Sequence, residues 1–151
     1  KLAAFTVFSE FLFNSAVLIV FINGKIGGGS PCAGPPFWKP AKAGQPGFIE
    51  GGTQFLQDAT YYTPAVDFPR LSTVASRFEQ GYRFWPAFQA FHSVSTADLL
   101  HLVAHSMGCA FAEGLACGAV KDGYTIGKVG YINCYQAQDL VISTERQYTI
   151  D

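Results

Sequence analysis

The sequence predicts an α/β domain with a mostly parallel sheet and flanking helices. Three observations support this class: an apolar run over 17–22, a second over 99–104 that leads into a helix of small residues, and alternating strand-like and helix-like segments. With 151 residues, the chain is long enough for one domain with a substantial core. We therefore expect a single unit over 1–151.

The N-terminal segment 2–22 is apolar enough to be considered as a signal or membrane segment. Glu10 and Asn14 interrupt it and leave two shorter runs, 5–8 and 17–22. This division favours two strands over a membrane span. The run over 17–22 is continuous and β-branched, which predicts a central strand covered on both faces.

A long stretch rich in glycine and proline follows, over 25–52. It exceeds the usual connection length, and such loops often carry function. Its three consecutive glycines lack the lysine and Ser/Thr of a phosphate-binding loop. We expect Phe37 and Trp38 to line a substrate pocket, and the alternative is a flexible surface loop.

The middle of the chain predicts a weak strand over 53–62 and a helix over 70–91. Pro86 is expected to kink or divide that helix. One face of the helix is apolar, with Val74, Phe78, Tyr82 and Trp85.

The remaining elements are a helix over 107–120 and strands over 129–135 and from residue 146. Small residues recur along the helix, which close packing against a sheet would explain. Gly123 stands just after its expected end, as is common for helix C-termini.

Composition narrows the function classes. The net charge is −1 and no lysine or arginine run occurs, so nothing indicates nucleic-acid binding. The four cysteines show neither a C-x-x-C motif nor metal-type spacing with histidine. Buried thiols are favoured over disulfides, no metal site is expected, and a cytoplasmic location is favoured.

The most informative motif is the stretch 104–108, Ala-His-Ser-Met-Gly, which places Ser106 in a turn between a strand and a helix. This is the form of a nucleophile elbow. Ala104 and Gly108 are small enough to leave room for a strained serine backbone. The helix that follows points its N-terminal amides toward a developing negative charge, so the amide of Met107 is the expected first oxyanion donor.

The second oxyanion donor should follow an earlier strand. Asn23, Gly24 and Lys25 come directly after the strongest strand, and glycine lets the backbone approach a substrate closely. We expect the donor to be the amide of Gly24 or Lys25. The alternative is a plain turn.

The stretch 102–108 resembles the H-S-M-G elbow of the α/β-hydrolase superfamily, on its lipase and esterase side. Ala104 stands where glycine is commoner. In element order the resemblance covers roughly 17–150. It implies hydrolysis of an ester or acyl compound, either small or lipid-like, through an acyl-enzyme on Ser106. It implies no metal or organic cofactor.

The superfamily order is serine, acid, then histidine, yet no histidine follows Ser106. Asp139 fits one arrangement of the acid, and the alternative is a solvated loop aspartate. Asp151 is expected to be a strand residue or a chain end. The resemblance therefore implies that the sequence covers part of a longer hydrolase whose histidine lies outside it. Such a piece would expose a sheet edge and self-associate.

The three histidines all precede the serine. We expect His105 to be directed into the packing behind the turn and His101 to be buried against a helix. His92 is free enough to reach across. Two alternatives to the hydrolase remain: a catalytically inactive hydrolase-like domain that binds a ligand or partner, and a small α/β binding or structural protein whose resemblance is fortuitous.

Overall fold

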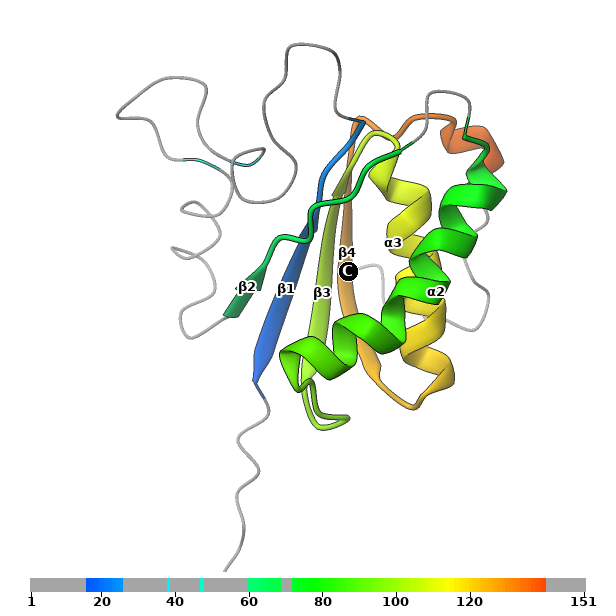
Figure 1. Ribbon diagram of the computed structural model, residues 1–151. Helices are drawn as coiled ribbons and strands as arrows, with labels where there is room; N and C mark the ends of the chain where they lie inside the picture. Colours follow the sequence, from blue (N-terminus) through cyan, green and yellow to red (C-terminus); the bar gives the residue numbers. More distant parts are fainter. Residues whose placement is uncertain (1–15, 26–37, 39–46, 48–59, 69–71, 141–151) are drawn as a thin grey trace, which may run out of the picture.

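The computed structural model describes residues 16–25, 38, 47, 60–68 and 72–140 (Figure 1). The strands predicted over 5–8 and from residue 146, and all but two residues of 26–52, lie outside these ranges.

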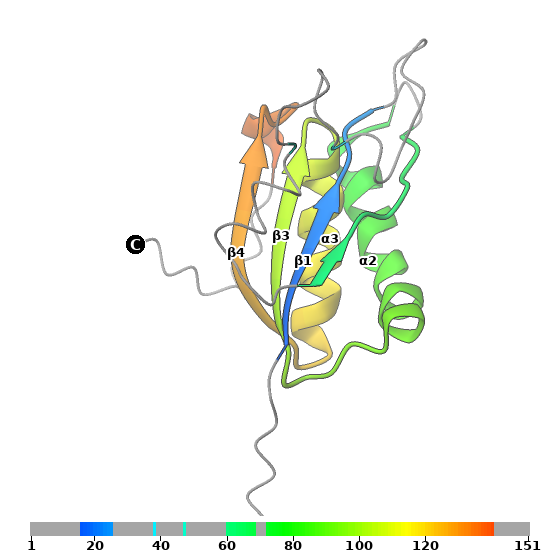
Figure 2. The same ribbon diagram turned by 90° about the vertical axis from the view of Figure 1, so that its left-hand side faces the viewer.

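Four parallel strands form the sheet, in the spatial order β2-β1-β3-β4 (Figure 2). They are β1 (Val17–Ile22), β2 (Thr60–Tyr62), β3 (Leu99–His105) and β4 (Thr125–Ile132). This arrangement confirms the predicted α/β class with a parallel sheet. β3 is one residue longer than its apolar run, and the observed β2 is the last part of the predicted weak strand.

β1 is the central strand that its continuous apolar run predicts. Leu18, Val20 and Ile22 belong to the core beneath the helices, whereas Ile19 and Phe21 belong to a second cluster. Trp38 completes that second cluster, with its ring centroid 5.2 Å from that of Phe21. Because side chains alternate along a strand, only a strand covered on both faces needs apolar residues at every position.

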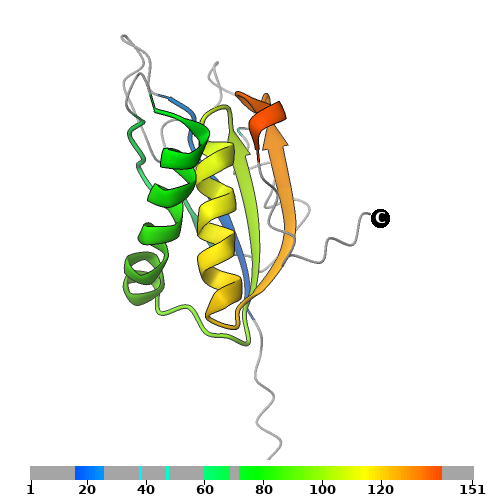
Figure 3. The same ribbon diagram turned by 90° about the vertical axis from the view of Figure 1, so that its right-hand side faces the viewer.

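Both helices, α2 (Val74–His92) and α3 (Gly108–Lys121), cover the same face of the sheet and lie side by side (Figure 3). The crossovers from β2 to β3 and from β3 to β4 run in the same direction across the sheet. Right-handed crossovers in one direction must lie on one face. Neither described helix combines the length and the hydrophobicity that a membrane crossing requires.

α2 begins later than predicted because Thr73 caps it. The Thr73 hydroxyl accepts a hydrogen bond from the Ser76 amide at 3.1 Å. Pro86 is predicted to kink or divide this helix; it does not divide it, since one helix of 19 residues runs through it. Figure 1 shows the last turns of α2 curving away from the axis of the first.

The predicted apolar face of α2 is also wrong in part. Of the predicted residues only Trp85 is buried; the other buried positions are Arg77, Gly81 and Phe88. The buried face of α2 is therefore rotated from the predicted one toward α3. The reason is that the two helices can come into contact only where α2 carries its smallest residue, Gly81.

The small residues of α3 allow close packing on two sides. Gly108 lies against the end of β1, in line with the expected packing on the sheet, whereas Gly114 and Gly118 lie against α2. A Cβ atom at Gly114 would overlap the Phe78 carbonyl oxygen, and one at Gly81 would overlap that of Phe111. Gly118 approaches the Trp85 side chain in the same way. The two helix backbones thus touch directly where their glycines face each other.

The last described strand differs from its prediction over 129–135, because β4 spans Thr125–Ile132. Its register with β3 shifts between Leu100 and Leu102, where β4 holds an extra residue in a bulge. Asn133 ends the strand with a φ of 47°. The predicted glycine stop after α3 is confirmed, since Gly123 has a φ of 85°.

Candidate active site

Ser106 occupies the turn between β3 and α3 in a left-handed backbone conformation, with a φ of 51°. Few residues other than glycine adopt this region, and a serine held there stores about 1–2 kcal/mol of strain. The side chain is half-buried. A strained serine between a parallel strand and a helix has the backbone geometry of a nucleophile elbow.

Gly108 and Ala104 make this sharp turn possible. A Cβ atom at Gly108 would overlap the Asn23 carbonyl oxygen and lie 3.0 Å from the Ile22 side chain. Ala104 is completely buried in the core beneath the helices. Only a glycine at position 108 lets α3 begin directly against the end of β1.

Backbone hydrogen bonds hold the turn on both sides. The Ser106 amide donates to the Ile132 carbonyl at 2.9 Å, at the end of β4. The Ser106 carbonyl accepts from the amides of Cys109 at 3.3 Å and Tyr135 at 3.2 Å. These bonds stabilise the strained conformation.

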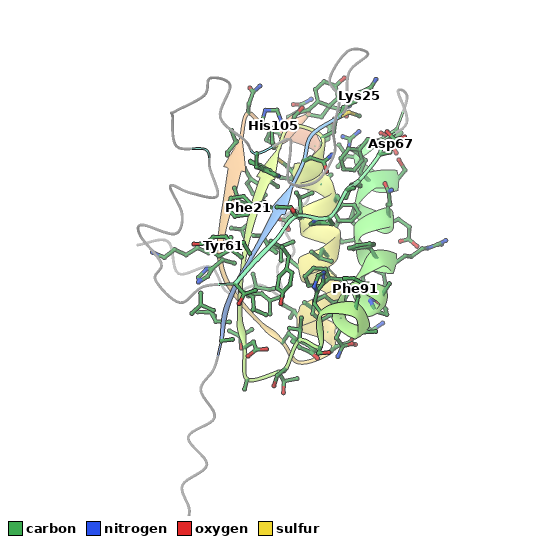
Figure 4. All side chains as sticks on the ribbon, turned by 60° about the vertical axis from the view of Figure 1, so that its left-hand side comes forward. Phe21, Lys25, Tyr61, Asp67, Phe91 and His105 are labelled. Carbon is green, nitrogen blue, oxygen red and sulfur yellow. The ribbon has the colours of Figure 1, made fainter. Side chains whose placement is uncertain are left out.

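The structure brings the predicted oxyanion residue Gly24 against the serine. A Cβ atom at Gly24 would lie 3.0 Å from the Ser106 Cβ and 2.5 Å from Nδ1 of His105. Met107 is the N-cap residue of α3, directly after the serine. Lys25 lies with His105 at the same end of the sheet (Figure 4). That these amides bind an oxyanion stays a prediction.

Asn23 holds the chain next to Ser106, a role that the sequence did not predict. Its side chain is completely buried and makes three hydrogen bonds: Nδ2 donates to the Gly24 and Val66 carbonyls, both at 2.7 Å, and Oδ1 accepts from the Val66 amide at 3.1 Å. It therefore fixes the chain after β1 to the segment after β2. A polar residue directly at the end of an apolar strand was the available signal.

The serine and Gly24 lie where the sheet order reverses. From β1 the chain moves to β2 on one side, and β3 is then added on the other side of β1. Open parallel sheets bind ligands beyond the carboxyl ends of the strands that flank such a switch point. Asn23 and Gly24 follow β1, and Ser106 follows β3, so both chain segments meet there.

His105 lies next to the serine, whereas His92 lies far from it. His105 ends β3 on the face opposite α2 and α3, beside Gly24, and burial lowers the pKa of its imidazole. His92 ends α2, with its ring centroid 3.9 Å from that of Tyr62. Tyr62 is level with Leu102, four residues before the serine, or about 13 Å along the strand. His92 therefore stacks away from Ser106.

His101 is half-buried on the face of the sheet opposite α2 and α3, so, contrary to the expectation, it does not pack against either described helix. Its Nδ1 accepts a hydrogen bond from the Lys128 amide at 2.7 Å, within the bulge of β4. A Cβ atom at Gly127 would lie 2.5 Å from the ring. His101 thus has a structural role in supporting the bulge.

We predict that acidification destabilises the protein through this histidine. Burial lowers the pKa of His101 below its ordinary value of 6.5, and the charge of Lys128 makes a smaller contribution in the same direction. The unfolded chain therefore takes up the proton first as the pH falls. The free energy of unfolding should be constant above about pH 7 and decrease below about pH 6.5. Urea titrations at pH 7.5 and 5.5 measure this decrease, and it should be smaller in His101→Gln. An equal decrease in the variant contradicts the assignment.

The remaining predicted site residues are placed as follows. Asp139 is exposed, at the end of a 3₁₀ turn (Ala137–Asp139), and borders a hollow of about 740 Å³ against the first turn of α2. Trp38 is buried against Phe21, whose position is shown in Figure 4. Phe37 lies outside the described residues. The acid role of Asp139 and the pocket role of Trp38 stay predictions.

Within the described ranges, no group of histidine, cysteine and acidic side chains could hold a metal ion. Comparison of the chain with protein-family models, with curated proteins and with solved structures gave no match.

Proposed function

We propose that this chain is a serine hydrolase of the α/β-hydrolase type, which cleaves an ester or acyl substrate through an acyl-enzyme on Ser106. The observation that carries the proposal is the left-handed backbone of this serine, at a φ of 51°, between β3 and α3. Ser93 has the same φ but caps α2, so the support comes from the strained serine together with its place, at the end of a parallel strand and against Gly24.

The proposed reaction begins with attack of the Ser106 hydroxyl on the substrate carbonyl carbon. The tetrahedral oxyanion is stabilised by the amide of Met107, by that of Gly24 or Lys25, and by the N-terminus of α3. The alcohol leaves with a proton, and water then hydrolyses the acyl-enzyme. We infer that a histidine from outside this sequence takes the serine proton. His92 and His101 are held in other contacts, and His105 packs with its ring beside Gly24.

A fluorophosphonate probe tests the proposal, because it reacts covalently with activated serines. We expect the full-length gene product to be labelled and Ser106→Ala to lose at least about 100-fold in labelling rate. Ser93→Ala is the matched control: Ser93 also has a φ of 51° but caps α2, and it should label like the wild type.

Ser106→Gly separates chemistry from folding. This variant lacks the hydroxyl but fits the left-handed conformation, so it should remain unlabelled and be about 1 kcal/mol more stable than Ser106→Ala. Labelling that persists in Ser106→Ala would show that another residue reacts. A wild-type protein that stays unlabelled from about pH 6 to 9 would instead support a hydrolase-like binding domain.

A further inference from the structure

Two cysteines lie together directly behind the elbow. Cys109, the second residue of α3, is completely buried, and Cys134, just after β4, is half-buried. Both thiols are free, and they lie close enough to interact electrostatically. Sγ of Cys109 donates to the Ala104 carbonyl at 3.6 Å, and Sγ of Cys134 to the Tyr135 carbonyl at 3.9 Å. Their backbones also converge, because the amides of Cys109 and Tyr135 donate to the same Ser106 carbonyl. Such convergence permits the short Cα separation that a disulfide requires.

A buried cation accompanies the two thiols. The Arg77 side chain is completely buried and interacts electrostatically with both Cys109 and Cys134. Its two terminal nitrogens donate to neutral oxygens, of Ser72 at 2.6 Å and Gln136 at 2.8 Å. Its Nε has no hydrogen-bond partner among the described residues.

We propose that Cys109 and Cys134 form a thiol modification site, at which a small disulfide of the glutathione class oxidises the pair to an intramolecular disulfide. The inference does not depend on hydrolase activity, because it concerns the sulfur atoms alone.

The reaction proceeds by two thiol–disulfide exchanges. The half-buried Cys134 loses its proton and attacks one sulfur of glutathione disulfide, which forms a mixed disulfide and releases one glutathione thiolate. Cys109 then loses its proton and attacks the Cys134 sulfur, releasing the second glutathione. Both cysteines are oxidised, and one glutathione disulfide is reduced to two thiols. Burial raises the pKa of Cys109, so Cys134 is the thiol that attacks the dissolved glutathione disulfide first.

The product would connect the first turn of α3 with the chain after β4, across the Ser106 carbonyl. It closes a loop that contains α3 and β4, which restricts the unfolded chain. We therefore expect the oxidised protein to melt at a temperature roughly 5 °C or more above that of the reduced protein.

The test is incubation of the full chain with glutathione disulfide, alkylation of the remaining thiols and mapping of the peptides by mass spectrometry. We expect a peptide that links Cys109 to Cys134, removed by dithiothreitol, and the higher melting temperature. Cys109→Ser should retain glutathione on Cys134, and Cys134→Ser should leave Cys109 alkylated only after unfolding. Cys117→Ser, a control in the same helix, should form the link unchanged.

Other results would overturn the proposal. These are glutathione retained on Cys134 in the wild-type protein without the link, a link that involves Cys32 or Cys117, or no reaction while the protein stays folded. The Cys117→Ser control separates a general effect of a cysteine substitution in α3 from the loss of this pair.

Discussion

Replacing Gly114 with alanine should lower the free energy of unfolding by about 3 kcal/mol. Alanine has a helix propensity about 1 kcal/mol better than that of glycine, so propensity alone predicts the opposite sign. The steric effect is larger because the new Cβ atom would overlap the Phe78 carbonyl oxygen and lie 2.8 Å from the Tyr82 amide nitrogen. Both are backbone atoms of α2, which cannot rotate away as a side chain can.

Urea unfolding followed by circular dichroism measures this loss. Gly130→Ala is the matched control, since a Cβ atom at Gly130 in β4 meets nothing within 4 Å. It should change the free energy of unfolding by no more than about 0.5 kcal/mol. Gly81→Ala tests the same contact from the side of α2 and should cost a similar amount. A stabilised Gly114→Ala protein would contradict the backbone contact between the helices.

Replacing Asn23 with alanine should also lower the free energy of unfolding by about 3 kcal/mol. The variant leaves the Val66 amide and the Val66 and Gly24 carbonyls without the partners that the Asn23 side chain supplies. Each buried polar group that loses its partner costs about 1–3 kcal/mol. Because Asn23 also fixes Gly24 beside Ser106, fluorophosphonate labelling of the folded variant should slow by about 10-fold or more.

Two further variants test this explanation. Asn23→Asp keeps the shape and an acceptor for the Val66 amide, but its ionised carboxylate cannot donate to either carbonyl. It should therefore be at least as destabilised as the alanine variant near neutral pH. Gln138→Ala, which removes an exposed amide side chain, should leave both stability and labelling unchanged. Normal stability with slow labelling in Asn23→Ala would separate the positioning effect from folding.

The sequence predicted most accurately those strands that are buried on both faces. The run over 17–22 is apolar at every position, which predicts a strand buried on both faces, and β1 has these bounds. Prediction was less accurate where burial is one-sided. β4 begins earlier than expected because Thr125 and Ile126 pair with β3. The side chains of β4 are only partly buried, so they give no continuous apolar run. The buried face of α2 depends on where α3 crosses it.

For the candidate site too, some features could be predicted from local sequence and others could not. Local sequence was sufficient to predict the sharp turn at Ser106, because a strand, a turn and a helix of small residues are contiguous in the chain. Gly24 was expected beside this serine because it follows the strongest strand. The Asn23 bonds to Val66 and the Tyr135 bond to the Ser106 carbonyl, which brings Cys134 near Cys109, join segments far apart in the sequence. No local pattern encodes such contacts.

The sequence by itself therefore determined the α/β fold class of this protein and the position of its strained serine. Both follow from short-range periodicity and from the backbone conformations that particular residues permit. Only the tertiary structure decided that α3 packs on α2 through glycines, that His101 supports a bulge and that Asn23 holds Gly24 beside Ser106. The physical reason is that close approach and hydrogen-bond partnership depend on strand order and helix crossing, which one strand or helix alone does not specify.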